Sequence, residues 1–157
     1  MRIALEHPAR PEVMALIGEL DAYQSSLYPA ESNHFIDVQA LAQPGVLFAV
    51  GRDAQGRALA CGAVMVQEGW GELKRMFVRG QARGQGFGAA LLAYLETQAH
   101  ARGCRQLMLE TGIRQPEALR LYERHGYRLR GPFGAYAEDP LSVFMQKDLT
   151  GGPGAAQ

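Results

Sequence analysis

Glycine residues gather in one short segment of the chain, Arg79–Ala90, where Gly84, Gly86 and Gly88 alternate with other residues. Because glycine has no Cβ, the backbone here can turn tightly and bring its amide N–H groups close to a ligand. The apolar spacing that follows predicts a helix starting near Gly86, and a helix N-terminus adds free N–H donors and partial positive charge. Arg83 can add a bidentate donor. The segment therefore predicts a phosphate or pyrophosphate site, although a glycine-rich turn without a ligand would contain the same residues.

Two nucleotide-binding motifs compete for this segment. A Walker A loop is excluded because no Gly-Lys-Ser/Thr follows the glycines. The dinucleotide-binding pattern G-x-G-x-x-G/A fits Gly84, Gly86 and Ala89, and Glu110 ends the next predicted strand at about the expected distance. Against this pattern, the preceding strand is too charged to be buried on both faces, and about half of the chain lies before the motif. We therefore do not expect a dinucleotide-binding fold.

Composition excludes several classes of protein. The chain has 157 residues, 47% of them hydrophobic, and its 16 Lys and Arg balance 16 Asp and Glu. This length suits one domain, and the zero net charge argues against a nucleic-acid partner or a polybasic membrane-surface protein. No stretch approaches the roughly 20 apolar residues of a membrane span, and no signal peptide is expected at the start. Two cysteines without C-x-x-C spacing, Cys61 and Cys104, fit a reducing cytoplasm.

Hydrophobic periodicity predicts a mixed sheet flanked by helices. Strands are expected at residues 2–6, 46–50, 58–66, 70–78, 106–110, 127–129 and 141–146, and helices at 8–26, 37–42, 87–102 and 116–125. Asp53-Ala54-Gln55-Gly56 is typical of a hairpin turn. Residues 150–157 have no side chains able to form a core, so a flexible tail is predicted there.

The segments around the glycine cluster follow a recognisable order. The cluster itself also reads as Arg83-x-x-Gly86-x-Gly88, a charged strand at 72–78 precedes it, and Gln115–Tyr127 follows with a Leu-Tyr and a Gly-Tyr pair. These segments, together with 134–147, resemble the GCN5-related N-acetyltransferases, or GNAT family, and in particular a bacterial subgroup. The resemblance covers about residues 46–148. It implies one N-acetyltransferase domain over residues 1–149 and an α/β fold with one mixed, mostly antiparallel sheet. That sheet would have six or seven strands and about four flanking helices, with the central parallel strands splayed at an acetyl-CoA site.

The implied reaction is transfer of the acetyl group from acetyl-CoA directly to a primary amine of a small molecule or peptide, without an acyl-enzyme. The residues that would contact acetyl-CoA lie on a strand end, the glycine loop and the next helix: Met76, Phe77, Val78, Arg83, Gly84, Gln85, Gly86, Phe87, Gly88, Ala89 and Gln115. Gln115 stands where the family often has asparagine, and its amide offers the same donors and acceptors one methylene further out. No metal is expected, because the histidines and cysteines show no metal-ligand spacing.

The resemblance assigns the chemistry to two side chains. Tyr122 matches the family tyrosine that protonates the leaving thiolate, and Glu72 occupies a strand position where several members carry a general base. Each residue also has a plainer interpretation. Tyr122 would be an aromatic core residue on an amphipathic helix, and Glu72 a solvated carboxylate paired with neighbouring cations.

The acceptor pocket is implied to lie between the first helical region and the loop before the last strand. Its candidate residues are Tyr28, Glu31, His34 and Tyr136, and acidic groups beside aromatic rings suit a small cationic amine. The family's strand geometry is compatible with a homodimer. A second hypothesis, a catalytically silent CoA-binding sensor or interaction module, keeps the glycine loop but does not need Glu72 or Tyr122.

Overall fold

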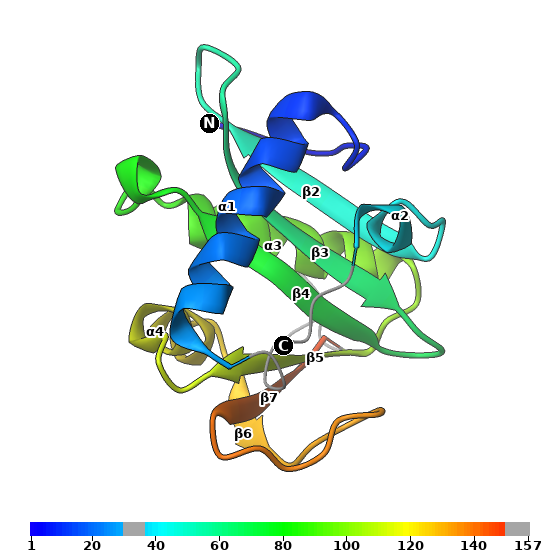
Figure 1. Ribbon diagram of the computed structural model, residues 1–157. Helices are drawn as coiled ribbons and strands as arrows, with labels where there is room; N and C mark the ends of the chain where they lie inside the picture. The colour runs from blue at the N-terminus through cyan, green and yellow to red at the C-terminus, as the bar shows by residue number, and fades with distance from the viewer. Residues whose placement is uncertain (30–36, 150–157) are drawn as a thin grey trace.

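The computed structural model describes residues 1–29 and 37–149, which build one seven-stranded sheet in the order β1-β2-β3-β4-β5-β7-β6 (Figure 1). Among these strands, only β4 and β5 pair in parallel. The expected mixed, mostly antiparallel sheet with four flanking helices is confirmed. Along the chain the elements are β1 (Arg2–Leu5), α1 (Pro11–Leu27), α2 (Val38–Leu41), β2 (Val46–Arg52), β3 (Ala58–Val66), β4 (Gly71–Val78), the 3-10 turn η2 (Gly80–Ala82), α3 (Phe87–Ala101), β5 (Gln106–Gly112), α4 (Pro116–Arg124), β6 (Arg128–Arg130) and β7 (Ser142–Asp148).

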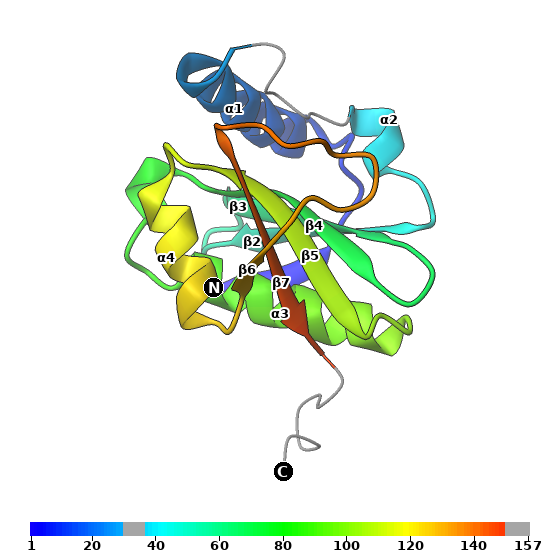
Figure 2. The ribbon, with the colours of Figure 1, turned by 90° about the horizontal axis from the view of Figure 1, so that it is seen from below.

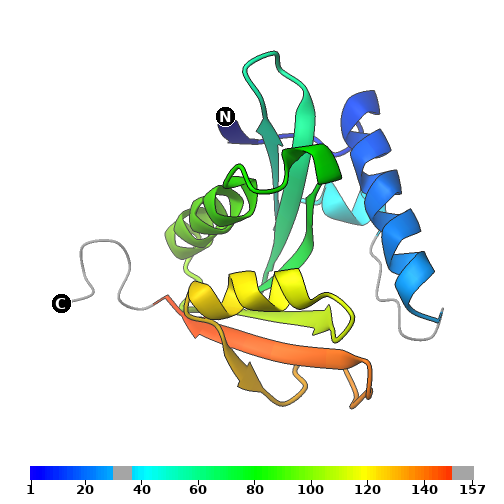
Figure 3. The same cartoon turned by 90° about the vertical axis from the view of Figure 1, so that its left-hand side faces the viewer.

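Helices cover both faces of the sheet (Figure 2). On one face, α1 buries an i, i+3, i+4, i+7 stripe against β2 and β3 and is joined there by α2. On the other face, α3 and α4 pack against the central strands (Figure 3). The largest fully buried side chains of the two faces include Val13, Leu16, Leu41, Val50, Leu91, Leu92, Leu95, Leu107, Leu109 and Met145. The sheet thus separates two cores, and the two parallel strands lie between them.

The two parallel strands diverge at the centre of the sheet. Their ladder has three residue pairs and ends at Leu73↔Leu109, although the strands continue to Val78 and Gly112. Close to this point the β3–β4 ladder shifts register, and Arg75 adopts a φ of 61°, which is uncommon for a residue with a side chain. Beyond Leu73, therefore, the edge of β4 that faces β5 has no strand partner among the described residues.

The predicted elements are all present, with shifted boundaries. The first helix begins at Pro11 rather than residue 8, and β5 runs to Gly112, two residues beyond its predicted end. Glu31, His34 and the tail over 150–157 lie outside the described residues. Among the residues that are described, no helix is both long and apolar enough to span a membrane.

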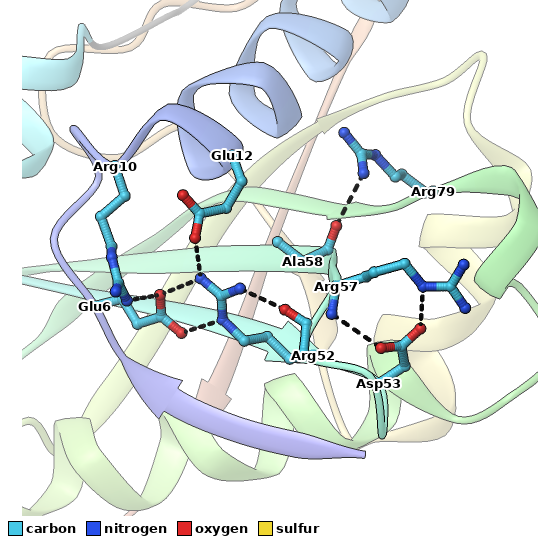
Figure 4. A network of polar contacts seen from close by, with 9 residues as sticks. Glu6, Arg10, Glu12, Arg52, Asp53, Arg57, Ala58 and Arg79 are labelled. Atoms are coloured by element: carbon cyan, nitrogen blue, oxygen red, sulfur yellow. Dashed lines mark hydrogen bonds and ion pairs between the residues drawn. The ribbon is translucent and has the colours of Figure 1, made fainter.

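A buried arginine ties together the start of α1 and the outer strands (Figure 4). Arg52, only 6% exposed, donates from Nε and Nη2 to the two carboxylate oxygens of Glu6 at 2.8 and 2.7 Å. It also donates to the carbonyl oxygen of Gly56 at 2.6 Å and to Glu12 at 3.1 Å. This bidentate pair is among the stronger polar contacts available to a protein. It lies at the first turn of α1, whereas the cavities described below lie at the opposite end of that helix.

Candidate active site

The glycine segment connects β4 to α3 through η2 and residues 83–86. Gly84 and Gly86 have φ values of 79° and 85°, in the left-handed region that favours glycine, and Gly86 is the N-cap of α3. The first main-chain bond of the helix runs from Ala90 N to Gly86 O. The amides of residues 87–89 therefore have no acceptor within the helix, and together with the helix dipole they favour a bound anion.

Glycine at position 88 serves a different purpose. A Cβ at Gly88 would lie 3.2 Å from Leu121 Cδ2 of α4 and 4.0 Å from a methyl group of Val78. The absence of a side chain thus lets the first turn of α3 approach both α4 and the end of β4.

A cavity of about 380 Å³ opens between the end of β4, the glycine segment and α4, and we call it the loop cavity. Its volume lies within the range of small-molecule and cofactor pockets. Every predicted acetyl-CoA contact except Gln85 lines it; Gln85 instead donates to Gln81 O at 3.2 Å on the exposed surface. Arg83 is 46% exposed and lies 3.4 Å from Glu117 Oε2, a surface pair of little energetic value that an anionic ligand can replace.

A second cavity, which we call the strand cavity, lies where β4 and β5 diverge. It has a volume of about 90 Å³ and is lined by the end of α1, both diverging strands and the start of α4. Four residues line both cavities: Met76, Gln115, Ala118 and Tyr122. The two cavities are therefore adjacent and meet at these side chains.

Tyr122 lies at this junction. It is 6% exposed, and its ring packs edge-on against Tyr127 with 5.7 Å between ring centroids. Burial raises its pKa above the usual value, and the charge of Glu110 adds to the effect. Within the described part of the chain, the Tyr122 hydroxyl makes no hydrogen bond to another residue. The phenol is therefore protonated at neutral pH and available to a ligand in either cavity.

Tyr28, a predicted acceptor residue, also lines the strand cavity. Its hydroxyl accepts from the amide of Arg114 at 3.0 Å and lies 3.4 Å from Gln115 Oε1. The phenol lies so close to the backbone that a Cβ at Gly112 would come within 1.8 Å of the Tyr28 oxygen. The end of α1 is thus fixed to the connection between β5 and α4.

The other two predicted side chains, Glu72 and Tyr136, contact each other and line neither cavity. The Tyr136 hydroxyl donates to Glu72 Oε2, and Lys74 Nζ contacts both groups, at 2.9 Å from Tyr136 and 3.4 Å from Glu72. Tyr136 packs against the rings of Phe133 and Phe144, which hold its loop on the sheet. Burial, together with the hydrogen bond to Glu72, raises the pKa of Tyr136.

Three charged residues of the strand cavity, Lys74, Arg75 and Glu110, were not among the site residues predicted from the sequence. In the sequence, Glu110 stands out only as the end of a predicted strand, and Lys74 and Arg75 only as the cations that neighbour Glu72. Ser142 Oγ donates to Glu110 Oε2 at 2.7 Å, and the Arg75 guanidinium pairs with Asp21 of α1. The available signal was a single carboxylate at the end of the apolar run Leu107-Met108-Leu109.

Among residues 1–29 and 37–149, no group of three or more His, Cys, Asp or Glu side chains is placed to hold a metal ion. The described residues of the two cavities offer main-chain amides, tyrosines, carboxylates and cations. Such a set can bind an anion, donate a proton and accept one. These capacities match group transfer between two substrates held in adjacent cavities.

Comparison with known proteins points to one family. A model of the Acetyltransferase (GNAT) family matches residues 14–127. An IAA acetyltransferase from Azospirillum brasilense is 48% identical over 149 residues, covering 94% of this chain and 97% of the relative.

Solved structures agree on the fold. A protein from Klebsiella pneumoniae, described as a proposed acyl-CoA N-acyltransferase, is 43% identical and superposes with a TM-score of 0.81, covering 94% of this chain and 97% of that one. An aminoglycoside 6'-N-acetyltransferase complexed with coenzyme A has a TM-score of 0.72 at 19% identity, covering 95% of this chain and 97% of that one. The chain belongs to the GNAT family of acetyltransferases and is an acyltransferase.

Proposed function

We propose that this acyltransferase moves the acetyl group of acetyl-CoA directly onto a primary amine of a small molecule or peptide. The observation that carries the proposal is the junction of the two cavities, where Tyr122 and Met76 line both. A donor in the loop cavity and an acceptor in the strand cavity would meet there. Both substrates would then be held together before reaction, as a ternary-complex mechanism requires.

The residues of the loop cavity fit the donor. Acetyl-CoA supplies an acetyl group activated as a thioester. The amides of residues 83–89 and the Arg83 guanidinium would hold the pyrophosphate at the start of α3. Beyond Leu73 the unpaired edge of β4 would hydrogen-bond the pantetheine arm as an added strand does. Gln115, which lines both cavities, would contact the same arm near its reactive end.

The chemical step forms a C–N bond between the amine and the acetyl carbon and breaks the C–S bond. The amine loses a proton as it attacks, and the sulfur gains one as it leaves. We assign the second proton to Tyr122, whose raised pKa keeps the phenol protonated and able to donate to the departing thiolate. The backbone N–H of Phe77 or Val78 is our candidate donor to the developing oxyanion.

Two carboxylates are candidates for the amine proton. Glu72 was expected from the sequence, but its carboxylate is engaged by Tyr136 and Lys74 and lines neither cavity. Glu110 lines the strand cavity together with Tyr122, whereas Glu72 does not. The geometry therefore supports Glu110 better as the group that accepts the amine proton.

Measuring kcat against pH for Glu110→Gln and Glu72→Gln decides between the two carboxylates. The base variant loses most turnover at low pH, where the amine is protonated, and a loss confined to Glu72→Gln would return the role to Glu72.

Related proteins leave the acceptor open, because one is named an IAA acetyltransferase and another an aminoglycoside acetyltransferase. The first experiment is calorimetry with acetyl-CoA, followed by a thiol-release assay with IAA, aminoglycosides, polyamines, amino acids and peptides. We expect tight acetyl-CoA binding and thiol release with at least one amine. Acetyl-CoA binding without thiol release for any acceptor would favour the silent CoA-binding module.

A cytoplasmic location is part of this proposal, because Cys61 and Cys104 are both buried and free.

Arg83→Gln provides a matched test of the donor site. It removes one phosphate contact, so we expect about tenfold weaker acetyl-CoA binding. Arg57→Gln is the control, because Arg57 is also an exposed arginine in a surface ion pair but belongs to the hairpin turn. Equal affinity losses in the two variants would contradict a local role for Arg83.

A further inference from the structure

Opposite charges face each other across the point where β4 and β5 diverge. The last pair of their ladder is Leu73↔Leu109, so the next residue on each strand is Lys74 on β4 and Glu110 on β5. Side chains alternate between the faces of a strand, so these two lie on the same face as the paired Glu72 and Met108. This face is the one covered by α1, and both Lys74 and Glu110 line the strand cavity.

Lys74 is held in place by its neighbours. Its side chain is 12% exposed, its Nζ lies 2.9 Å from the Tyr136 hydroxyl and 3.4 Å from Glu72 Oε2, and it lies over the Tyr136 ring at 5.6 Å from the centroid. An ammonium has three N–H donors, and two of them find acceptors among the described residues. The third remains for a ligand. A partly buried cation with a fixed position binds an anion more strongly than a solvated surface lysine does.

Glu110 supplies a negative charge to the same cavity. Its Oε2 accepts from Ser142 Oγ at 2.7 Å, which fixes the carboxylate on β5. Burial raises the pKa values of Tyr28, Tyr122 and Tyr136, three phenols near this part of the sheet, and the charge of Glu110 adds to the effect in each case. A cationic amine in the strand cavity would therefore be attracted to the β5 side and an anionic group to the β4 side.

We infer that the acceptor carries an acidic group beside its amine, and that Lys74 binds the acidic group while Glu110 faces the amine. This inference rests on the proposed function and names its substrate class, of which an amino acid is the simplest case. The acceptor enters as a zwitterion and gives one ammonium proton to Glu110. Its nitrogen then forms the C–N bond to the acetyl carbon and loses its second proton while the C–S bond breaks. Tyr122 protonates the departing sulfur and regains that second proton, so CoA leaves as the thiol, and the proton on Glu110 is the one that the net reaction liberates. The acidic group remains unchanged on Lys74 throughout.

The test compares acceptors that differ only in the acidic group. For each of several amino acids, kcat/KM is measured beside the matching primary amide and the matching decarboxylated amine, with rates expressed per neutral amine. We expect the wild-type enzyme to prefer the acid by about 10- to 100-fold, the range of one charge-assisted hydrogen bond. Aminoalkylphosphonates of the same chain length show whether a phosphonate can replace the carboxylate.

Three variants test whether Lys74 is the cause of the preference for acceptors that carry an acidic group. Lys74→Gln should reduce it to about onefold by raising KM for the acid, and Lys74→Arg should restore part of it by returning the positive charge. Lys147→Gln is the control, because Lys147 is also a partly buried lysine beside a carboxylate and a tyrosine ring but lies outside both cavities. It should leave the preference unchanged.

Two results would overturn the inference. If amines are acetylated with no preference for the acid, or if Lys74→Gln keeps the preference, the assignment of Lys74 fails while the proposed function stands. If no amine of any kind supports thiol release, the proposed function fails as well. Acetyl-CoA calorimetry on each variant shows that the donor site is intact, so a misfolded protein is not mistaken for either result.

Discussion

Tyr122→Phe separates chemistry from stability, because the structure gives the hydroxyl no hydrogen-bonding partner among the described residues. Removing it should change the free energy of unfolding by no more than about 0.5 kcal/mol. Loss of a positioned proton donor should nevertheless lower kcat by about 100-fold or more. Acetyl-CoA affinity should be largely unchanged, as expected for a group that acts in the transition state.

Tyr127→Phe is the matched control, because the two rings are in contact. The Tyr127 hydroxyl donates to Glu96 Oε2 at 2.9 Å, and the residue is 2% exposed. A hydrogen bond to a charged group contributes about 1.5–3 kcal/mol, so this variant should lose that much stability and keep its kcat. Urea denaturation gives the first quantity and steady-state thiol release the second. The reasoning is refuted if Tyr122→Phe retains full turnover, or if the two variants lose activity and stability in the same proportion.

Three further changes test other parts of the structure. Gly86→Ala forces a side chain into a left-handed backbone conformation, so it should cost about 1–2 kcal/mol of stability in urea denaturation and weaken acetyl-CoA binding in calorimetry. Arg52→Met breaks a buried ion pair, in which the two side chains are 8% and 9% exposed, and should cost about 3 kcal/mol by the same denaturation measurement. The hydrogen bond from Arg52 lowers the pKa of Glu6 in the folded state, so this carboxylate stabilises the protein above its unfolded pKa of about 4.5, and that contribution disappears as the pH falls through the folded pKa. Denaturation at several pH values should show a steeper acid loss in the wild type than in Arg52→Met, and parallel curves would contradict the linkage.

Much of the fold follows from local patterns in the sequence. The hairpin at Asp53–Gly56 was predictable because its residues satisfy the turn locally: Asp53 Oδ1 accepts from the amides of Gln55 and Arg57, and Gly56 takes a φ of 81°. The α1 stripe at 13, 16, 17 and 20 was predictable for the same reason, since helical spacing alone identifies its buried side. Information of this kind lies within a few neighbouring residues.

Other features depend on contacts between distant parts of the chain. Arg75 has a left-handed backbone conformation although it is not a glycine, so the sequence does not indicate this conformation. The Arg75 guanidinium pairs with Asp21 on α1, 54 residues earlier. The orientation of Glu72 depends on Tyr136, whose loop is placed by aromatic packing against Phe144. Spacing along one strand could identify Glu72 as a carboxylate near the site, but not which side chain would engage it.

The short ladder between β4 and β5 also has a mechanical consequence. Three residue pairs provide the whole strand-to-strand connection between a four-stranded half of the sheet, β1 to β4, and a three-stranded half, β5 to β7. This seam therefore resists separation less than the longer β3–β4 and β5–β7 ladders on either side of it. A strand-like ligand lying in it adds main-chain hydrogen bonds along β4 and packs against the far half, so binding should stiffen both halves together. Amide hydrogen exchange should then slow on β4 and β5 alike when acetyl-CoA is added, and a change confined to the glycine segment would show that the two halves move independently.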